Sequence, residues 1–156
     1  QSIRDNFGLP NLKKFSNKGW INKSAEADSF SDYIEKLQIK VSGHLQLASQ
    51  LSGGNQQKVV LAKWLERNAE ILIFDEPTRG IDVGAKYEIY QWMNQLAKAG
   101  KGIIMISSEL PEVLGMSDRI LVMKEGELMG ELTNGPNVTQ ETLMSLAIGE
   151  KVEQAA

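Results

Sequence analysis

The 156-residue sequence contains no cysteine and a single histidine, His44. The absence of cysteine excludes disulfide bonds, thiolate zinc sites and cysteine nucleophiles. One histidine excludes a histidine-rich metal site and most histidine-dependent catalysis. No apolar run approaches the ~18 residues that a membrane-spanning helix requires.

The sequence is also short of positive charge. Its 17 lysines and arginines stand against 20 aspartates and glutamates, which gives a net charge of −3. This balance argues against a protein whose main task is to bind nucleic acid, because such domains are usually basic. The 42% of hydrophobic residues and 24% of charged residues are ordinary for a globular protein. We therefore expect a cytoplasmic, acidic domain of mixed secondary structure.

Hydrophobic spacing predicts the elements of secondary structure. Residues 8–23, rich in glycine, asparagine and lysine, are predicted to form a loop. Helices are predicted over 24–38, 55–68, 84–98, 109–114 and 139–149, with Ser24 and Thr139 as N-caps of the first and last. Trp64 and Met93 fall on apolar helix faces and are predicted to be core residues.

Strands are predicted over 71–74, 103–106, 120–123 and 128–132. The first two are continuous apolar runs, which are typical of parallel strands buried on both faces. From residue 70 onward the order strand, helix, strand, helix, strand, strand indicates an α/β fold with a parallel sheet. We therefore predict a helical subdomain over 1–69, half of an α/β core over 70–132, and a C-terminal helix and tail over 133–156.

Two carboxylates, Asp75 and Glu76, follow directly on the predicted strand 71–74. Ligands of parallel sheets bind beyond the carboxyl ends of the strands. A carboxylate there can hold Mg²⁺, directly or through water, and a second one can polarise an attacking water. The alternative is a solvated loop that merely begins with two acids, and this stretch alone favours it.

The stretch Leu51-Ser52-Gly53-Gly54-Asn55-Gln56-Gln57-Lys58 precedes the predicted helix 55–68. Its glycines allow the backbone to approach a ligand closely. The hydroxyl of Ser52 and the free N–H groups at the helix start can bind anionic oxygens. A plain helix entry is the alternative, and the glycines and serine alone favour it.

Together these stretches resemble the motifs of ATP-binding cassette (ABC) ATPases. Residues 51–58 resemble the signature motif, and residues 71–78 resemble the Walker B strand. Residues 78–86 resemble the D-loop region of the tandem-cassette ATPases of bacterial sugar importers. Residues 107–123 are similar to the second cassette of that subgroup. The resemblance covers roughly residues 20–150 and implies a partial P-loop NTPase (ABC ATPase) core with parallel strands, preceded by a helical subdomain.

In that family two cassettes meet head to tail, and each ATP lies between the P-loop of one and the signature of the other. The resemblance implies that ATP held by the first cassette contacts Ser52, Gly53, Gly54, Asn55 and Gln56. It implies that Glu76 is the catalytic base, that Asp75 holds Mg²⁺ through water, and that Asp82 lies at the interface between cassettes. On this basis Gly54→Asp is expected to abolish transport while the fold survives.

Two departures from the family pattern affect these expectations. The sequence has no Gly-x-x-x-x-Gly-Lys-Ser/Thr motif, so the resemblance implies the C-terminal part of a second cassette, inactive as a fragment. Ser108 occupies the switch position, where most members have a histidine that contacts the γ-phosphate. A hydroxyl carries no positive charge, so we expect slow hydrolysis at the site that contains Ser108.

The resemblance implies a function for the intact protein. It would be the ATP-binding subunit of a sugar importer for ribose, galactose, xylose, arabinose or a similar cargo. It would use ATP and Mg²⁺ and lie at the cytoplasmic face of the membrane. Its partners would be the first cassette, membrane permease subunits facing the helical subdomain and, indirectly, a sugar-binding protein, with no nucleic acid.

Two alternatives remain at this stage. The first is a non-catalytic scaffold or interaction module derived from an ABC cassette. The second is a chromosome-maintenance or DNA-repair ATPase, which carries a similar signature. That class requires long coiled-coil heptads beside the signature, and residues 1–50 contain none.

Overall fold

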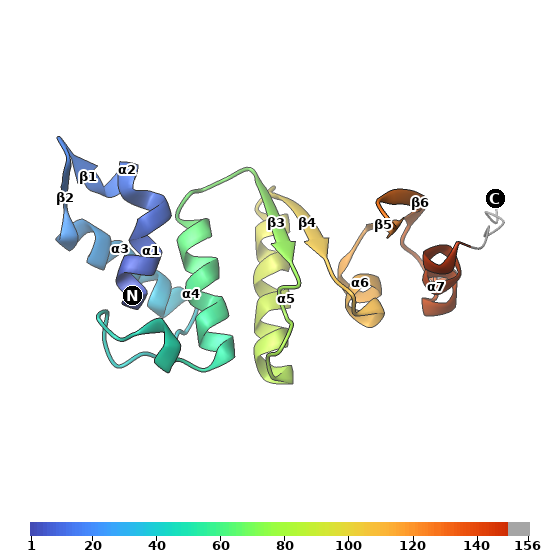
Figure 1. The fold of residues 1–156 in the computed structure, drawn as a ribbon, viewed down its shortest axis with the longest axis horizontal. Helices are drawn as coiled ribbons and strands as arrows, with labels where there is room; N and C mark the ends of the chain where they lie inside the picture. The colour runs from blue at the N-terminus through green and yellow to red at the C-terminus, as the bar shows by residue number, and fades with distance from the viewer. Residues whose placement is uncertain (150–156) are drawn as a thin grey trace. The chain divides into compact units, whose positions relative to one another are not determined.

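The computed structural model describes residues 1–149, and Figure 1 shows their elements along the chain. Two compact units share these residues. The first unit comprises residues 1–72 and 78–103, and the second comprises residues 73–77 and those from 104 onward. The three-part division made from the sequence stays a prediction. Within the described residues, no helix is long and apolar enough to cross a membrane.

The N-terminal part of the first unit is more structured than the sequence predicts. Its elements are α1 (Ile3–Gly8), the 3₁₀ helix η1 (Leu9–Asn11), α2 (Leu12–Phe15), β1 (Ser16–Asn17), β2 (Trp20–Ile21) and α3 (Lys23–Lys36). The predicted loop over 8–23 is therefore wrong. Lys18 and Gly19 have φ values of 49° and 84°, and they make the tight turn that joins β1 to β2. Elements of two to four residues are too short for hydrophobic periodicity to reveal.

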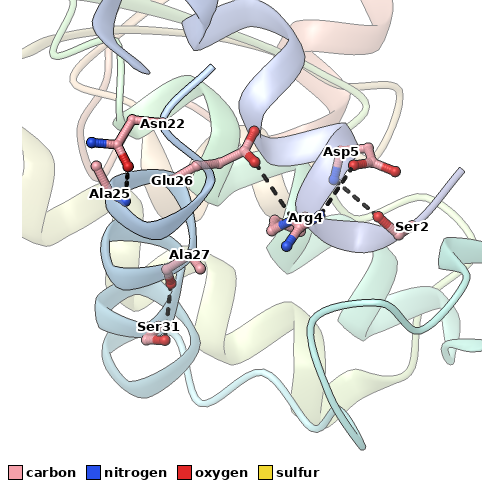
Figure 2. Close-up of polar contacts among 8 residues, drawn as sticks. All are labelled: Ser2, Arg4, Asp5, Asn22, Ala25, Glu26, Ala27 and Ser31. Atoms are coloured by element: carbon pink, nitrogen blue, oxygen red, sulfur yellow. Dashed lines mark hydrogen bonds and ion pairs between the residues drawn. The ribbon is translucent and has the colours of Figure 1, made fainter. Parts of the chain in front are cut away.

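Helix α3 begins one residue earlier than predicted and has a different cap. Asn22 is its N-cap, and the Asn22 side chain accepts a hydrogen bond from the Ala25 backbone at 3.1 Å (Figure 2). The predicted cap, Ser24, instead lies inside the helix and donates to Asp28 at 3.5 Å. Asparagine and serine cap helices about equally well, so composition alone does not choose between two candidates so close together.

The core of the first unit is built on aromatic rings. Phe7 of α1 is fully buried, with its ring centroid 4.8 Å from that of Phe30 and 5.6 Å from that of Tyr33. Beside these rings, Arg4 and the buried Glu26 form an ion pair at 3.5 Å (Figure 2). Burial raises the pKa of Glu26, although Arg4 opposes the shift. This packing joins α1 to α3 in one small helical core.

Two further helices of the first unit follow the 3₁₀ helix η2 (Ala48–Gln50). They are α4 (Gly53–Leu65) and α5 (Val83–Lys98), and both were predicted. Met93 is buried, as predicted, but Trp64 is 50% exposed. The prediction of a core position for Trp64 is therefore wrong. Its ring lies beneath the Lys63 ammonium, 5.5 Å from the ring centroid.

The strands β3 (Ile71–Asp75) and β4 (Gly102–Ile106) are hydrogen-bonded neighbours. Gly102 N donates to Glu70 O, and Glu76 N donates to Ile106 O. Because the partners advance together along both strands, the pair is parallel, as predicted. Burial on both faces is not observed, since Ile71 is 64% and Ile73 is 66% exposed. An unbroken apolar run does not reveal which of its alternating side chains are covered.

The second unit contains a hairpin covered by helices. Its elements are α6 (Leu110–Met116), β5 (Arg119–Lys124), β6 (Glu127–Thr133) and α7 (Gln140–Ile148). Strands β5 and β6 pair antiparallel. The core residues are Ile120, Val122, Leu143 and Leu146. Thr139 caps α7, as predicted.

Candidate functional site

Glu76 is held at the carboxyl ends of β3 and β4. Its backbone N–H donates to Ile106 O at 2.9 Å, and its Oε1 accepts from the Ser108 backbone N–H at 3.0 Å. The φ of Glu76 is +46°, a region that residues other than glycine rarely adopt. Such strain persists only where the surroundings impose it, and it is frequent at functional sites. The structure thus fixes both the backbone and the carboxylate of Glu76.

The turn that carries Ser108 is organised by its own side chains. Ser107 Oγ accepts from Glu109 N at 3.0 Å and donates to the carboxylate of Glu112. Glu112 lies in the first turn of α6 and is only 5% exposed. Glu112 was not among the site residues predicted from the sequence. The sequence feature that could have indicated Glu112 is a carboxylate in the first turn of a predicted helix, five residues after a serine at the end of a predicted strand.

Asp75 is the last residue of β3 and is exposed. Within residues 1–149, no three histidine, aspartate or glutamate side chains are grouped closely enough to hold a metal by themselves. Mg²⁺ commonly takes one or two carboxylates, with phosphate and water supplying its other ligands. Asp75 therefore fits a Mg²⁺ ion that arrives with a phosphate ligand.

The signature residues form the entry to α4. Ser52 is the N-cap residue, but its side chain makes no cap hydrogen bond. Instead, Asn55 Nδ2 donates to Ser52 Oγ at 2.9 Å, and Asn55 Oδ1 accepts from Lys40 N at 2.9 Å. The Gln56 side chain donates to Leu51 O at 3.0 Å. The side chains of Asn55 and Gln56 thus form hydrogen bonds with protein groups at and beside Ser52, and these bonds fix the conformation of the loop.

The two signature glycines have different surroundings. A Cβ atom on Gly54 would lie 2.9 Å from the Cβ of Ala85 in α5, closer than real contacts allow. A Cβ on Gly53 would make only ordinary contacts, 3.6 Å from Gly80 O and 3.7 Å from the Ile81 side chain. Gly54 is therefore required for the packing of α4 on α5. The expectation that Gly54→Asp would leave the fold intact conflicts with this geometry.

Helices α4 and α5 are also joined through polar groups. Asp82 is the N-cap of α5, where its Oδ1 accepts from Ala85 N at 3.0 Å. Lys58 of α4 is buried, donates to Gln38 O at 3.3 Å and forms an ion pair with Glu88 of α5. The first unit thus brings the signature residues and Asp82 together at neighbouring helix starts.

The predicted site residues fall into two groups. Ser52, Gly53, Gly54, Asn55, Gln56 and Asp82 belong to the first unit, and Asp75, Glu76 and Ser108 belong to the second. The sequence model of the ABC transporter family matches residues 1–79, just over half of the 156. The chain belongs to the ABC transporter family.

Named relatives are similar to this ABC transporter chain over most of its length. It is 57% identical over 148 residues to the ribose import ATP-binding protein RbsA of Bacillus licheniformis. It is 52% identical over 149 residues to the putative ribose/galactose/methyl galactoside import ATP-binding protein 1 of Rhizobium etli. These alignments cover 95% and 96% of this chain, but only 30% and 28% of the relatives. The chain thus spans about a third of the length of the curated relatives it matches.

Solved structures of ABC proteins share the fold. A putative metal-chelate type ABC transporter in an inward-facing conformation matches with a TM-score of 0.77 at 16% identity, over 94% of this chain and 58% of that one. The dimeric structure of the bacterial ABC transporter cassette MJ0796 matches with a TM-score of 0.72 at 24% identity, over 86% of this chain and 57% of that one. The predicted α/β ABC ATPase fold is therefore confirmed.

Proposed function

We propose that this chain is part of the ATP-binding subunit of a sugar importer. In the intact protein, ATP binding and hydrolysis would drive carbohydrate uptake through a membrane permease. The observation that carries the ATPase assignment is Glu76, whose carboxylate is fixed beyond two parallel strands by the Ser108 N–H. The import names of the relatives support the sugar assignment, with ribose and galactose as the leading cargoes.

Glu76 is proposed as the general base that polarises the attacking water. A positioned carboxylate acts in this way when it lies within hydrogen-bonding reach of the water. Asp75, next to it at the end of β3, would hold Mg²⁺ through a water molecule. When bound, Mg²⁺ neutralises charge on the phosphate oxygens. Ser108 would present a neutral hydroxyl near the γ-phosphate, where most members of the family present histidine.

The signature residues are proposed to complete a second ATP site, whose phosphates are held by another cassette. The Ser52 hydroxyl and the free N–H groups at the start of α4 are suited to anionic oxygens. Gly53 has no neighbour closer than ordinary contact distance and leaves its backbone accessible. Asn55 and Gln56 would serve this site by shaping the Ser52 loop, and Asp82 would contribute to the cassette interface.

The partners follow from this arrangement. They are the first cassette of the same protein, the permease subunits and, through the permease, a sugar-binding protein. The subunit would act peripherally at the cytoplasmic face of the membrane. The scaffold alternative is not favoured, because a scaffold has no need of a carboxylate held by a strained backbone at the strand ends.

Reconstitution of the full-length protein with its permease tests the proposal. ATP-dependent uptake of labelled ribose or galactose into vesicles would be compared for the wild type, Ser52→Arg and Glu127→Ala. Glu127 is exposed at the start of β6 and serves as the control. We expect uptake to be lost in Ser52→Arg and unchanged in the control. Full uptake with Ser52→Arg would show that the signature residues do not form part of an ATP site. The absence of sugar-stimulated ATP hydrolysis in the wild type would reject the importer assignment.

A further inference from the structure

We propose that Glu112 is a positioning residue for Glu76. Through Ser107, it holds the turn that directs the Ser108 N–H at the Glu76 carboxylate. This inference rests on the proposed function, in which Glu76 is the catalytic base. The four residues belong to the second unit.

Burial distinguishes Glu112 from an ordinary helix-start carboxylate. Glutamate is rarely buried unless it is paired, because removing a charge from water is costly. Glu112 is 5% exposed, and its carboxylate accepts a hydrogen bond from Ser107 Oγ. An exposed acid would serve the first turn of α6 equally well. The burial of Glu112 therefore calls for a role beyond capping the helix.

The contacts run in one continuous series from Glu112 to Glu76. The Ser107 hydroxyl donates to Glu112, and its oxygen accepts from Glu109 N at 3.0 Å. These two bonds close the turn on both sides of Ser108. The Ser108 N–H then points at Glu76 Oε1 at 3.0 Å. Without Glu112, the Ser107 hydroxyl loses the acceptor that directs it, and the turn loses one of the hydrogen bonds that hold it.

Glu76 depends on this anchor for its orientation. Its exposed neighbours Asp75 and Ser108 do not enclose it, and its side chain extends from a strained backbone. A hydrogen bond from a backbone N–H to a carboxylate is among the stronger ones available to it. A catalytic group that is poorly held loses rate even when its substrate still binds. Loss of Glu112 should therefore reduce turnover at the Glu76 site and leave the affinity for ATP unchanged.

The first test measures the Ser108 hydrogen bond itself, in the full-length protein that carries this chain. Hydrogen exchange of the Ser108 amide, resolved by overlapping peptides across residues 104–112, would be compared among Glu112→Ala, Glu112→Gln, Ser107→Ala and the control Glu127→Ala. Glu112→Ala and Ser107→Ala should speed the exchange about tenfold, the effect of losing one hydrogen bond to a charged group. Glu112→Gln retains an acceptor oxygen for Ser107 and should exchange like the wild type.

The second test separates positioning from mere structural support. The share of steady-state ATP hydrolysis that Glu76→Gln removes is the contribution of the Glu76 site. Glu112→Ala should remove part of that same share, with KM for ATP unchanged, and should cause no further loss in the Glu76→Gln background. Glu112→Gln should restore the rate. A role that is only structural predicts additive losses.

The outcomes distinguish this inference from the proposed function. Unchanged Ser108 exchange in Glu112→Ala overturns the inference. So does faster exchange throughout α6, β5 and α7, or a further loss of hydrolysis in the double variant. If Glu76→Gln removes no hydrolysis, Glu76 is not the base and the proposed function fails at this site, while the exchange arm still decides whether Glu112 holds the turn.

Discussion

Asn55 fixes the chemical role of Ser52. The Lys40 backbone N–H can only donate, so the Asn55 atom that faces it at 2.9 Å is the amide oxygen. The amide nitrogen of Asn55 must then face Ser52 Oγ, to which it donates at 2.9 Å. The Ser52 oxygen thereby accepts from Asn55 with one lone pair, and because Asn55 offers it no acceptor, the hydroxyl proton is available to an anionic ligand. The hydrogen bond from Asn55 thus prepares the Ser52 hydroxyl to donate to a ligand.

The substitution Asn55→Asp tests this relationship in the full-length protein. Aspartate keeps the Lys40 bond but accepts from Ser52 instead of donating to it. We expect KM for ATP to rise by about tenfold, the order of one lost hydrogen bond to a charged group. Asn55→Asp also adds a negative charge, so it must be repeated in a Ser52→Ala background, where only the charge effect remains. An equal effect in both backgrounds would show that Asn55 does not act through Ser52.

The contact between Gly54 and Ala85 predicts a second pair of effects. Gly54→Ala should lower the free energy of unfolding by about 1–3 kcal/mol, because the added methyl overpacks the α4–α5 contact. Gly53→Ala is the matched control and should be close to neutral. Ala85→Gly should restore stability when combined with Gly54→Ala. Chemical denaturation of the wild type and these three variants measures the free energy of unfolding, and a Gly54→Ala single variant as stable as the wild type would contradict the prediction.

Much of this architecture could be predicted from the sequence, and the reasons for the failures are specific. Helices α4 and α5 were found because 13 and 16 residues give several turns of apolar repeat. The hairpin at residues 16–21 was missed because a two-residue strand carries no period. Trp20, which lies in that hairpin, is 81% exposed.

The site was predictable only as far as its motifs reached. Ser52, Glu76 and Ser108 were selected because their neighbours form recognisable motifs. Glu112 was not selected, because its proposed role comes from its burial and from its hydrogen bond with Ser107. Gly54 was selected because its backbone could approach a phosphate. The structure gives a different reason, the close packing of Gly54 against Ala85, which depends on how α4 and α5 meet. The Gly54–Ala85 contact joins residues far apart in the sequence, so local sequence does not encode it.

The two ATP sites are expected to contribute unequally to hydrolysis. The Glu76 site has Ser108 where a charged donor is usual, and losing one such donor costs about 10²–10³ in rate. We therefore expect Glu76→Gln to lower steady-state ATPase activity only modestly. Ser52→Arg obstructs the opposite site and should nearly eliminate activity. Phosphate release from the reconstituted importer measures both, and equal damage from the two substitutions would mean that both sites fire or are tightly coupled.

Tyr33 makes the stability of the fold depend on pH in the alkaline range. Burial, reinforced by the nearby Glu66 carboxylate, raises the pKa of Tyr33 to about 12 from its ordinary value of 10.0. The folded protein therefore keeps this proton where the unfolded chain loses it. The stability that Tyr33 contributes is fully present below pH 10 and is lost as the pH rises toward 12.

Absorbance of tyrosinate against pH tests this prediction. The wild type should show a late ionisation that Tyr33→Phe removes, and Tyr33→Phe should also flatten the alkaline loss of stability. Tyr87→Phe is the control, because Tyr87 is exposed. A late step that survives in Tyr33→Phe would assign it to another tyrosine.

The junction of α4 and α5 has a mechanical consequence. The Lys58–Glu88 ion pair and the close approach of Gly54 to Ala85 join the two helices at successive turns of α4. Ser52 begins one helix and Asp82 begins the other. Because these contacts join the two helices near their starts, we expect a displacement of Ser52 to be transmitted to Asp82. Spin labels on the two helices should then keep one separation whether or not ATP is added.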